Sequence, residues 1–327
     1  MNPPKCNEYD YIDFLVATPR VFSCTEAARV QPDDTNAPAH DAINRLLSRM
    51  QSDSDHLWQE ARLQVDLISG VLILDDSTLD KLYARKIDLV SRHWSGKHRK
   101  VVSGINLITL LWTDGERYIP CDYRLFDKPT DGATKNDHFR QMLIKTGERG
   151  FKPECVLFDS WYASLDNLKT IRGFGWYWLT QLKGNRQVDP DRSGNLALSE
   201  VEIGEAGRVV HLKAYGLIRV FKIVAKDGSV EYWATNKLEM AEMERLKYAE
   251  MSQMIEQYHR GIKQFCGVER CQARRGRVQR NHIWLALRAF LRLEHHSYYK
   301  GISWFEAKVS ITREAVRAYL AKPLFTL

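Results

Sequence analysis

Four acidic residues, in three segments of the sequence, have the surroundings expected of metal-binding carboxylates. Asp75 and Asp76 end an apolar run in LILDDS, and Asp159 ends another in VLFDSW. Glu256 lies in MIEQYHRGIKQFCG (254–267), beside an apolar stripe with helical spacing. An acid at the end of a buried strand is costly unless it is paired or binds a metal ion. Mg²⁺ prefers carboxylate oxygens, so these residues predict a site that holds a pair of Mg²⁺ ions.

Each of these acids also has a purely structural interpretation. Asp76 could end a strand, Asp159 could be the N-cap of a helix, and Glu256 could form an i,i+4 pair with Arg260, worth a few tenths of a kcal/mol. The order of two strand-end aspartates followed by a helical glutamate favours one shared site. Adjacent residues on a strand point to opposite faces, so only one of Asp75 and Asp76 should reach the metal ions. We favour Asp76, with Asp75 as the alternative.

Groups that can carry positive charge follow Glu256 on the same face of the expected helix. His259, Arg260 and Lys263 lie three, four and seven residues after it. Lysine and arginine at these positions could bind phosphates beside a scissile bond. Lys81, five residues past Asp76, is a further candidate for the same task.

The positive charge of the chain is concentrated near its C-terminal end. The whole chain has a net charge of +7, whereas residues 1–65 carry −4 and residues 256–300 carry +7. Such a concentration suggests a polyanionic partner, although a solvated charged loop is the alternative. Five arginines of ERCQARRGRVQR are the candidates for contact with DNA: Arg270, Arg274, Arg275, Arg277 and Arg280.

The composition fits an ordinary globular protein. Of 327 residues, 44% are hydrophobic and 27% are charged. No apolar run reaches the roughly 20 residues of a membrane span, and the first residues do not read as a signal peptide. The six cysteines show no zinc-binding spacing and indicate reduced thiols in a cytoplasmic protein.

The order of expected elements defines an α/β fold. Strands are expected at 70–78, 101–112, 116–126, 154–162 and 176–182, and helices at 133–150 and 164–175. This order resembles the ribonuclease-H-like fold, a mixed sheet with helices. Its first and fourth strands are neighbours, so the strand-end aspartates would converge.

Five segments are expected along the chain. They are a small all-α domain that binds DNA or pairs DNA ends (1–65), the first part of the catalytic core (66–183), a β-rich insertion (184–237), the second part of the core with the Glu256 helix and the arginines (238–300), and a helical tail (301–327). One long helical stretch is expected over 238–267.

These motifs resemble those of the DDE transposases of the bacterial cut-and-paste insertion-sequence superfamily, over roughly residues 70–300. The D-D-[ST] motif is present as Asp75-Asp76-Ser77, and I-E-x-x-H-[RK]-x-x-K is present over 255–263. In the family pattern Y-x2-R-x3-E-x6-K, Lys263 matches the last position. Ser252 replaces the arginine of that pattern, and Ala249 replaces its tyrosine.

The resemblance implies a metal-dependent enzyme that cuts transposon ends and joins the freed 3′-OH to target DNA. It implies two Mg²⁺ ions per active site, for which Mn²⁺ can substitute, and double-stranded DNA as partner. A homodimer on DNA is expected, in the bacterial cytoplasm and associated with the nucleoid. The alternatives are a domesticated relative that binds DNA without cutting it, and a plain metal-dependent DNA nuclease.

Some members of the family hold a flipped base against an aromatic residue of the insertion. Tyr232 and Trp233 in EYWATN are the candidates here, because an unstacked base needs an aromatic surface. The alternative is that both are ordinary core residues of a strand.

Overall fold

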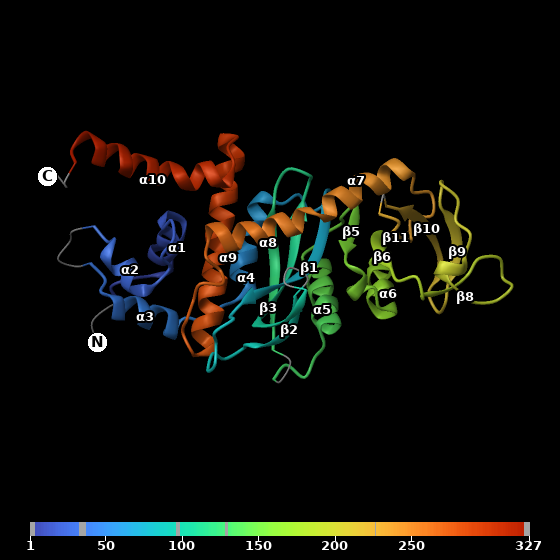
Figure 1. Cartoon of the computed structure of the whole chain (residues 1–327), viewed down its shortest axis with the longest axis horizontal. Helices are drawn as coiled ribbons and strands as arrows, with labels where there is room; N and C mark the ends of the chain where they lie inside the picture. Colours follow the sequence, from blue (N-terminus) through green and yellow to red (C-terminus); the bar gives the residue numbers. More distant parts are fainter. Residues whose placement is uncertain (1–3, 33–36, 96–98, 128–129, 226, 324–327) are drawn as a thin grey trace. The chain divides into compact units, whose positions relative to one another are not determined.

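A computed structural model describes residues 4–32, 37–95, 99–127, 130–225 and 227–323 (Figure 1). Its helices are α1 (Glu8–Ala17), α2 (Cys24–Arg29), α3 (His40–Arg49), α4 (Ser54–Ala61), α5 (Lys135–Glu148), α6 (Leu165–Gly173), α7 (Glu242–Ser252), α8 (Met254–Phe265), α9 (Gly276–Lys300) and α10 (Trp304–Ala321). Its strands are β1 (Val71–Asp80), β2 (Ser91–Ser95), β3 (Lys100–Thr113), β4 (Ile119–Phe126), β5 (Cys155–Phe158), β6 (Trp178–Leu182), β7 (Gln187–Asp189), β8 (Leu196–Ala197), β9 (Arg208–Leu212), β10 (Gly216–Val224) and β11 (Val230–Thr235). Short 3₁₀ turns are η1 (Arg62–Gln64), η2 (Ser160–Tyr162) and η3 (Leu198–Glu200).

The chain divides into two compact units, each assembled from separate stretches. The first contains Met1–Gln64, Ser77–Leu107 and Gln257–Leu327, and the second contains Val65–Asp76 and Ile108–Glu256. The strands β1 and β3 and the helix α8 therefore each contribute residues to both units.

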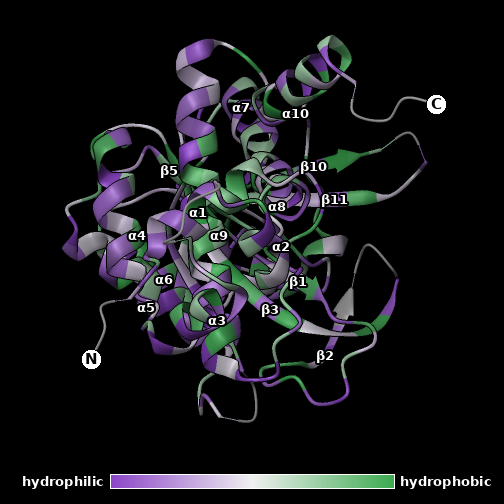
Figure 2. Cartoon of the chain, turned by 90° about the vertical axis from the view of Figure 1, so that its left-hand side faces the viewer, coloured by the Kyte–Doolittle hydropathy of each residue, from purple (hydrophilic) through white to green (hydrophobic). Residues whose placement is uncertain are grey.

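In the first unit, the N-terminal helices pack against the 25-residue helix α9. Polar side chains of α9 anchor them. The amide of Asn281 donates to the backbone oxygens of Leu47 and Met50, at 2.7 and 2.8 Å. Arg288 pairs with Glu60 at 2.7 Å, which ties α4 to α9. Helices α3 and α10 carry both hydrophobic and hydrophilic residues along their lengths, as Figure 2 shows.

The sheet confirms the α/β fold class and the central strand neighbours expected from the sequence. Its strand order is β2-β3-β1-β5-β6-β11-β10-β9-β7-β8, and β4 pairs with β3. β1 runs parallel to β5, and β5 runs parallel to β6. The apolar runs that predicted buried strands are indeed buried, since Val71–Leu74 and Cys155–Phe158 are almost inaccessible to solvent. The short strand β2 was not expected.

The β-rich insertion continues this sheet. β11 pairs with β6 in antiparallel fashion, with Tyr232 opposite Leu182 and Thr235 opposite Leu179. β10 then pairs with β11, and β9 with β10. The insertion is therefore hydrogen-bonded to the core strands from which it departs.

Helices cover the two faces of the central strands. The ring of Phe139 in α5 lies 5.2 Å from that of Phe158 in β5, whereas α7 contacts β5 and β6. The helical stretch expected over 238–267 is divided at Gln253 into α7 and α8, so Glu256 lies in the first turn of a new helix. None of the helices in the described part of the chain has the length and apolar character needed to cross a membrane.

Candidate active site

Asp75 and Asp159 occupy equivalent positions relative to the pairing of β1 with β5, although β1 continues past Asp75 to Asp80 and Asp159 directly follows β5. The paired positions of β1 and β5 run from Val71 opposite Cys155 to Leu74 opposite Phe158. Asp75 directly follows Leu74, and Asp159 directly follows Phe158. Adjacent strands of a sheet lie about 4.8 Å apart. The convergence expected from the sequence is therefore realised with Asp75.

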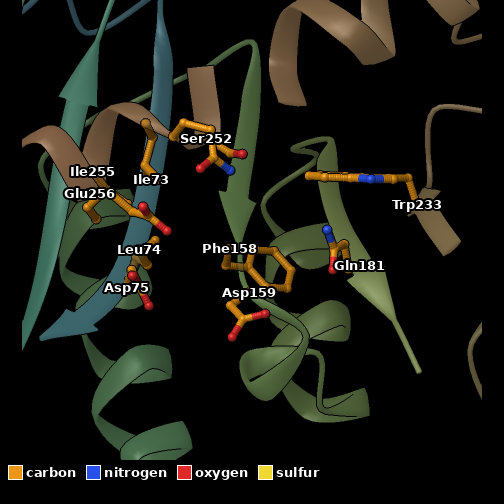
Figure 3. A pocket seen from close by; sticks show the side chains of 11 residues that line it. Ile73, Leu74, Asp75, Phe158, Asp159, Gln181, Trp233, Ser252, Ile255 and Glu256 are labelled. Carbon is orange, nitrogen blue, oxygen red and sulfur yellow. The ribbon is translucent and has the colours of Figure 1, made fainter. Parts of the chain in front are cut away.

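Asp75, Asp159 and Glu256 line one hollow of about 280 Å³ in the second unit. Figure 3 shows their carboxylates around the same space, from β1, from the end of β5 and from α8. Asp159 and Glu256 are exposed, and Asp75 is half-buried. The other lining residues are Ile73, Leu74, Phe158, Gln181, Trp233, Ser252, Gln253 and Ile255. The described residues that line the hollow include no lysine or arginine. When its three carboxylates are ionised, the hollow therefore concentrates negative charge.

The pKa of Asp75 reflects both its burial and the carboxylates around it. Burial raises the pKa of Asp75 well above its usual range, and the neighbouring carboxylates of Asp76, Asp159 and Glu256 raise it further. A cation in the hollow would remove this cost, because it offers the ionised carboxylate an opposite charge.

Asp76 points to the other face of β1, as expected for the neighbour of Asp75 on a strand. Its Oδ2 accepts a hydrogen bond from Lys135 Nζ at 2.7 Å, and its Oδ1 accepts one from the Tyr162 hydroxyl at 2.6 Å. Asp76 is not among the residues that line the hollow. The sequence-based preference for Asp76 over Asp75 is therefore reversed by the geometry, because Asp76 already has a cation and a hydroxyl as partners.

The donor set fits hard divalent cations, since three carboxylates from three separate elements line one space. Within the described part of the chain, no three His, Cys, Asp or Glu side chains gather closely enough to surround a single ion.

The candidate phosphate-binding residues near Glu256 differ in accessibility. Arg260 is exposed, whereas His259 is 6% exposed and packs against the ring of Tyr258. Lys263 is half-buried and donates to the backbone oxygen of Thr78 at 2.9 Å. Arg260 is therefore the residue of this helix best able to reach a ligand.

Lys81 has a structural environment. It is 4% exposed, and its ammonium donates to the backbone oxygens of Glu269, at 2.7 Å, and of Cys271. These bonds hold the segment before α9 against the end of β1. Because its charge is turned away from solvent, we do not retain Lys81 among the DNA-contacting candidates.

The arginine-rich segment is largely accessible. Arg270, Arg274, Arg275 and Arg277 are exposed, and Arg280 is half-buried. Besides the Lys81 bonds, Asp88 holds the segment twice: its carboxylate accepts from the backbone nitrogen of Gly276 at 2.8 Å, and its backbone nitrogen donates to the backbone oxygen of Arg274 at 2.8 Å. The exposed arginines thus surround the beginning of α9 with their side chains available to solvent.

The two aromatic candidates of the insertion lie on opposite faces of β11. Trp233 lines the hollow, and its indole donates to Glu231 at 2.9 Å. Gln181, on the neighbouring strand β6, donates to the same carboxylate at 3.1 Å. Tyr232 and Trp233 are almost equally buried, at 7% and 8% exposed, but Tyr232 does not line the hollow. The geometry therefore distinguishes Trp233 from its neighbour.

Sequence reasoning missed several residues of this region. Gln181 and Ser252 line the hollow, and Lys135 and Tyr162 contact Asp76. Only Ser252 had a signal, as the residue in place of the family's arginine. Lys135 and Tyr162 had none, because their contacts join elements that are distant in the sequence.

Comparisons with known proteins identify the family of the chain. The family model of the transposase DDE domain matches residues 69–292, which include all three carboxylates of the hollow. No curated protein sequence gives a significant match.

Among solved structures, the chain is similar to the piggyBac transposase in its synaptic complex with hairpin DNA. The TM-score is 0.53 and the identity 11%, over 100% of this chain and 74% of the other. The Mos1 strand transfer complex follows with a TM-score of 0.21 at 11% identity, covering 54% of this chain and 58% of that one. The pre-cleavage Mos1 transpososome has a TM-score of 0.20 at 10% identity, covering 54% and 59%. The first of these similarities shows a shared fold, of the ribonuclease-H-like class predicted.

Proposed function

The chain belongs to the transposase DDE domain family, and from that premise we propose that it is a DNA transposase that cleaves transposon ends and joins them to target DNA. The observation that carries the proposal is the hollow lined by Asp75, Asp159 and Glu256, with no cationic side chain among the described residues around it. Such a site attracts divalent cations and, through them, the phosphodiester backbone.

Asp75, Asp159 and Glu256 are the proposed ligands of two Mg²⁺ ions, for which Mn²⁺ can substitute. When bound, these ions activate an attacking water or 3′-OH and stabilise the leaving oxygen. Regular elements position these residues, with Asp75 on β1, Asp159 directly after β5 and Glu256 in the first turn of α8. The raised pKa of Asp75 supports this assignment, since its ionised form needs a compensating cation.

The remaining candidates are proposed to bind DNA. Trp233 supplies an aromatic face beside the carboxylates, suited to stacking an unpaired base. The exposed arginines before and within the first turn of α9 are suited to phosphates, and so is Arg260. We infer double-stranded transposon ends and target DNA as the partners, with action on the bacterial chromosome. Because two ends must be cut together, we propose a homodimer on DNA.

Cleavage and strand transfer can be tested directly. The full chain is incubated with Mg²⁺ or Mn²⁺ and with DNA carrying the ends of the element that encodes it, and 3′-OH products and joined strands are mapped. Wild-type protein is expected to give both products. Asp159→Asn and Glu256→Gln should abolish both while DNA affinity stays within a few-fold.

A matched control is Glu250→Gln, an exposed glutamate of α7 outside the hollow, which should cut normally. Normal cutting by Glu256→Gln would refute the site. Metal-dependent cutting without any joined strands would identify a nuclease, and DNA binding without cutting would identify a domesticated relative.

A further inference from the structure

The pairing of β1 with β5 stops one residue short of the two aspartates that line the hollow. Leu74 and Phe158 are the last paired positions, and Asp75 and Asp159 follow them. The ladder therefore aligns the strands up to Leu74 and Phe158, and a contact beyond it can help to set the separation of the two carboxylates.

Asp76 provides that contact on the opposite face of β1. Both of its oxygens are used, one by the Tyr162 hydroxyl at 2.6 Å and one by Lys135 Nζ at 2.7 Å. Burial and the neighbouring Asp76 carboxylate raise the pKa of Tyr162 well above its usual range, so the phenol keeps the proton it donates. The Lys135 ammonium balances the charge of Asp76, which limits repulsion between Asp76 and Asp75.

Tyr162 is joined directly to the residue on the other side of the site. Its backbone nitrogen donates to the backbone oxygen of Asp159 at 2.9 Å. The Asp159 side chain in turn accepts from Ser160 nitrogen at 2.5 Å and so caps η2. A continuous path therefore runs from Asp75 through Asp76 and Tyr162 to Asp159.

Packing fixes the Tyr162 side chain, so it can hold Asp76 in place relative to Asp159. It is fully buried, and its ring stacks on Phe139 with centroids 4.9 Å apart and planes inclined by 17°. Its backbone oxygen accepts from Asn167 at 2.9 Å, and the same amide donates to Asn136, the residue after Lys135, at 2.8 Å. The partners of Asp76 are therefore themselves fixed by α5 and α6.

We propose that Asp76, Tyr162 and Lys135 form a clamp that sets the separation of Asp75 and Asp159, and so the affinity of the site for divalent cations. These three are positioning residues and not metal ligands. The inference rests on the proposed function, because it concerns ions held by the carboxylates of the hollow. Contacts that orient ligands typically change metal affinity by about 10- to 100-fold when they are removed.

The clamp is tested by Mn²⁺ binding to the full chain without DNA, followed by the electron paramagnetic resonance signal of the free aquo ion. Tyr162→Phe removes one hydroxyl and keeps the buried ring. We expect its Mn²⁺ dissociation constant to rise roughly 10-fold. In cleavage, the half-saturating Mn²⁺ concentration should rise similarly, while the rate at saturating Mn²⁺ stays within a few-fold of wild type.

Tyr248→Phe is the matched control. Tyr248 is also buried, and its hydroxyl also donates to a carboxylate, that of Glu154 at 3.3 Å, just before the start of β5. It should bind Mn²⁺ like wild type. Equal losses in Tyr162→Phe and Tyr248→Phe, or no loss in Tyr162→Phe, would overturn the clamp.

A second variant keeps the test decisive if Tyr162→Phe unfolds. Asp76→Asn should also weaken Mn²⁺ binding, since it removes the charge that Lys135 balances. Where both variants fold, the double variant should lose less than the product of the two single effects, because both changes act on one hydrogen bond: Tyr162→Phe removes its donor, and Asp76→Asn weakens its acceptor. Independent, multiplicative effects would count against the clamp.

If the proposed function itself were wrong, the Mn²⁺-binding measurements would give a different result. If wild type binds no Mn²⁺, or if Asp159→Asn binds it as tightly as wild type, the carboxylates are not the ligands. If Asp159→Asn loses binding and Tyr162→Phe does not, the metal site stands and the clamp alone is refuted.

Discussion

Asp75 and Asp76 are consecutive on β1 and lie on opposite faces of the sheet, Asp75 at the hollow and Asp76 bonded to Lys135 and Tyr162. Two adjacent carboxylates of one strand therefore have different surroundings, for which we propose different roles. The difference can be measured, because each can be replaced by its uncharged amide.

Asp75→Asn is expected to reduce cleavage by roughly 10³-fold or more at any Mn²⁺ concentration, because it removes a ligand. Asp76→Asn should retain measurable cleavage at saturating Mn²⁺, because it alters only the support of that ligand. Initial cleavage rates over a Mn²⁺ titration distinguish the two. If Asp76→Asn were as inactive as Asp159→Asn at saturating Mn²⁺, Asp76 would be the ligand.

Asp75→Asn is also expected to stabilise the metal-free protein. The folded-state pKa of Asp75 is raised, so in the window between its unfolded pKa and that raised value the folded state binds more protons, and stability falls as pH rises. A neutral amide removes this cost, so the variant's Tm in EDTA at pH 7 should exceed that of wild type. Added Mg²⁺ should raise the Tm of wild type only. A lower Tm for Asp75→Asn in EDTA would contradict the pKa assignment.

His282 predicts a loss of stability in acid. It is fully buried between the Tyr11 hydroxyl at 3.0 Å and the Gly267 oxygen at 2.9 Å, and burial lowers its pKa to about 4, with a smaller contribution from Lys81. The unfolded state therefore takes up a proton first, and stability is lost as pH falls from about 6.5 to about 4, by up to roughly 3 kcal/mol. Denaturant unfolding across this range should be less pH-dependent in His282→Gln. The exposed His40→Gln serves as control and should follow wild type.

The arginine-rich segment predicts a change in salt dependence. Replacing Arg274, Arg275 and Arg277 by alanine should weaken DNA binding and flatten the plot of log affinity against log salt by about one slope unit per lost phosphate contact. The double variant Arg313→Ala, Arg317→Ala removes exposed arginines of α10 and is the comparison. An unchanged slope in the triple variant would identify the segment as a solvated loop.

Trp233 predicts a dependence on aromatic character. Trp233→Ala should weaken binding to transposon ends that carry an unpaired base near the cleavage site by about 1–3 kcal/mol, whereas Trp233→Phe should lose less. Fully paired DNA of the same sequence should respond less to either change. Equal losses on both DNAs would indicate that Trp233 serves only as a core residue of β11.

The sequence predicted the parts of the fold that depend on local pattern. The apolar run at 70–78 became β1, and Thr113-Asp114-Gly115 marked the connection between β3 and β4. The strand expected over 154–162 was too long: β5 ends at Phe158, and Ser160–Tyr162 form the 3₁₀ turn η2. Strand β2 was missed because its residues, SRHWS, carry no hydrophobic alternation. The attachment of the insertion to β6 could not be predicted, since strand pairing depends on which edges meet in three dimensions.

The prediction of the site from the sequence had the same limit. Alternation on a strand required that Asp75 and Asp76 diverge, but it could not say which one faced Glu256, because that depends on which helix covers which face. Lys81 was placed near the site by its distance in sequence, yet its ammonium is held by the backbone before α9. Spacing identified the charged groups, and tertiary packing decided which of them reach solvent.

The pairing of β11 with β6 also limits how this chain can diversify. An insertion that was joined to the core only by flexible linkers could be replaced by a different insertion. Here, excision of β7–β11 would leave the backbone groups of β6 without their partners along a hydrophobic edge, and such edges promote aggregation. Sequence changes that preserve the fold should therefore accumulate at the outer strands β7 and β8, whereas the pairing of β6 with β11 should be retained.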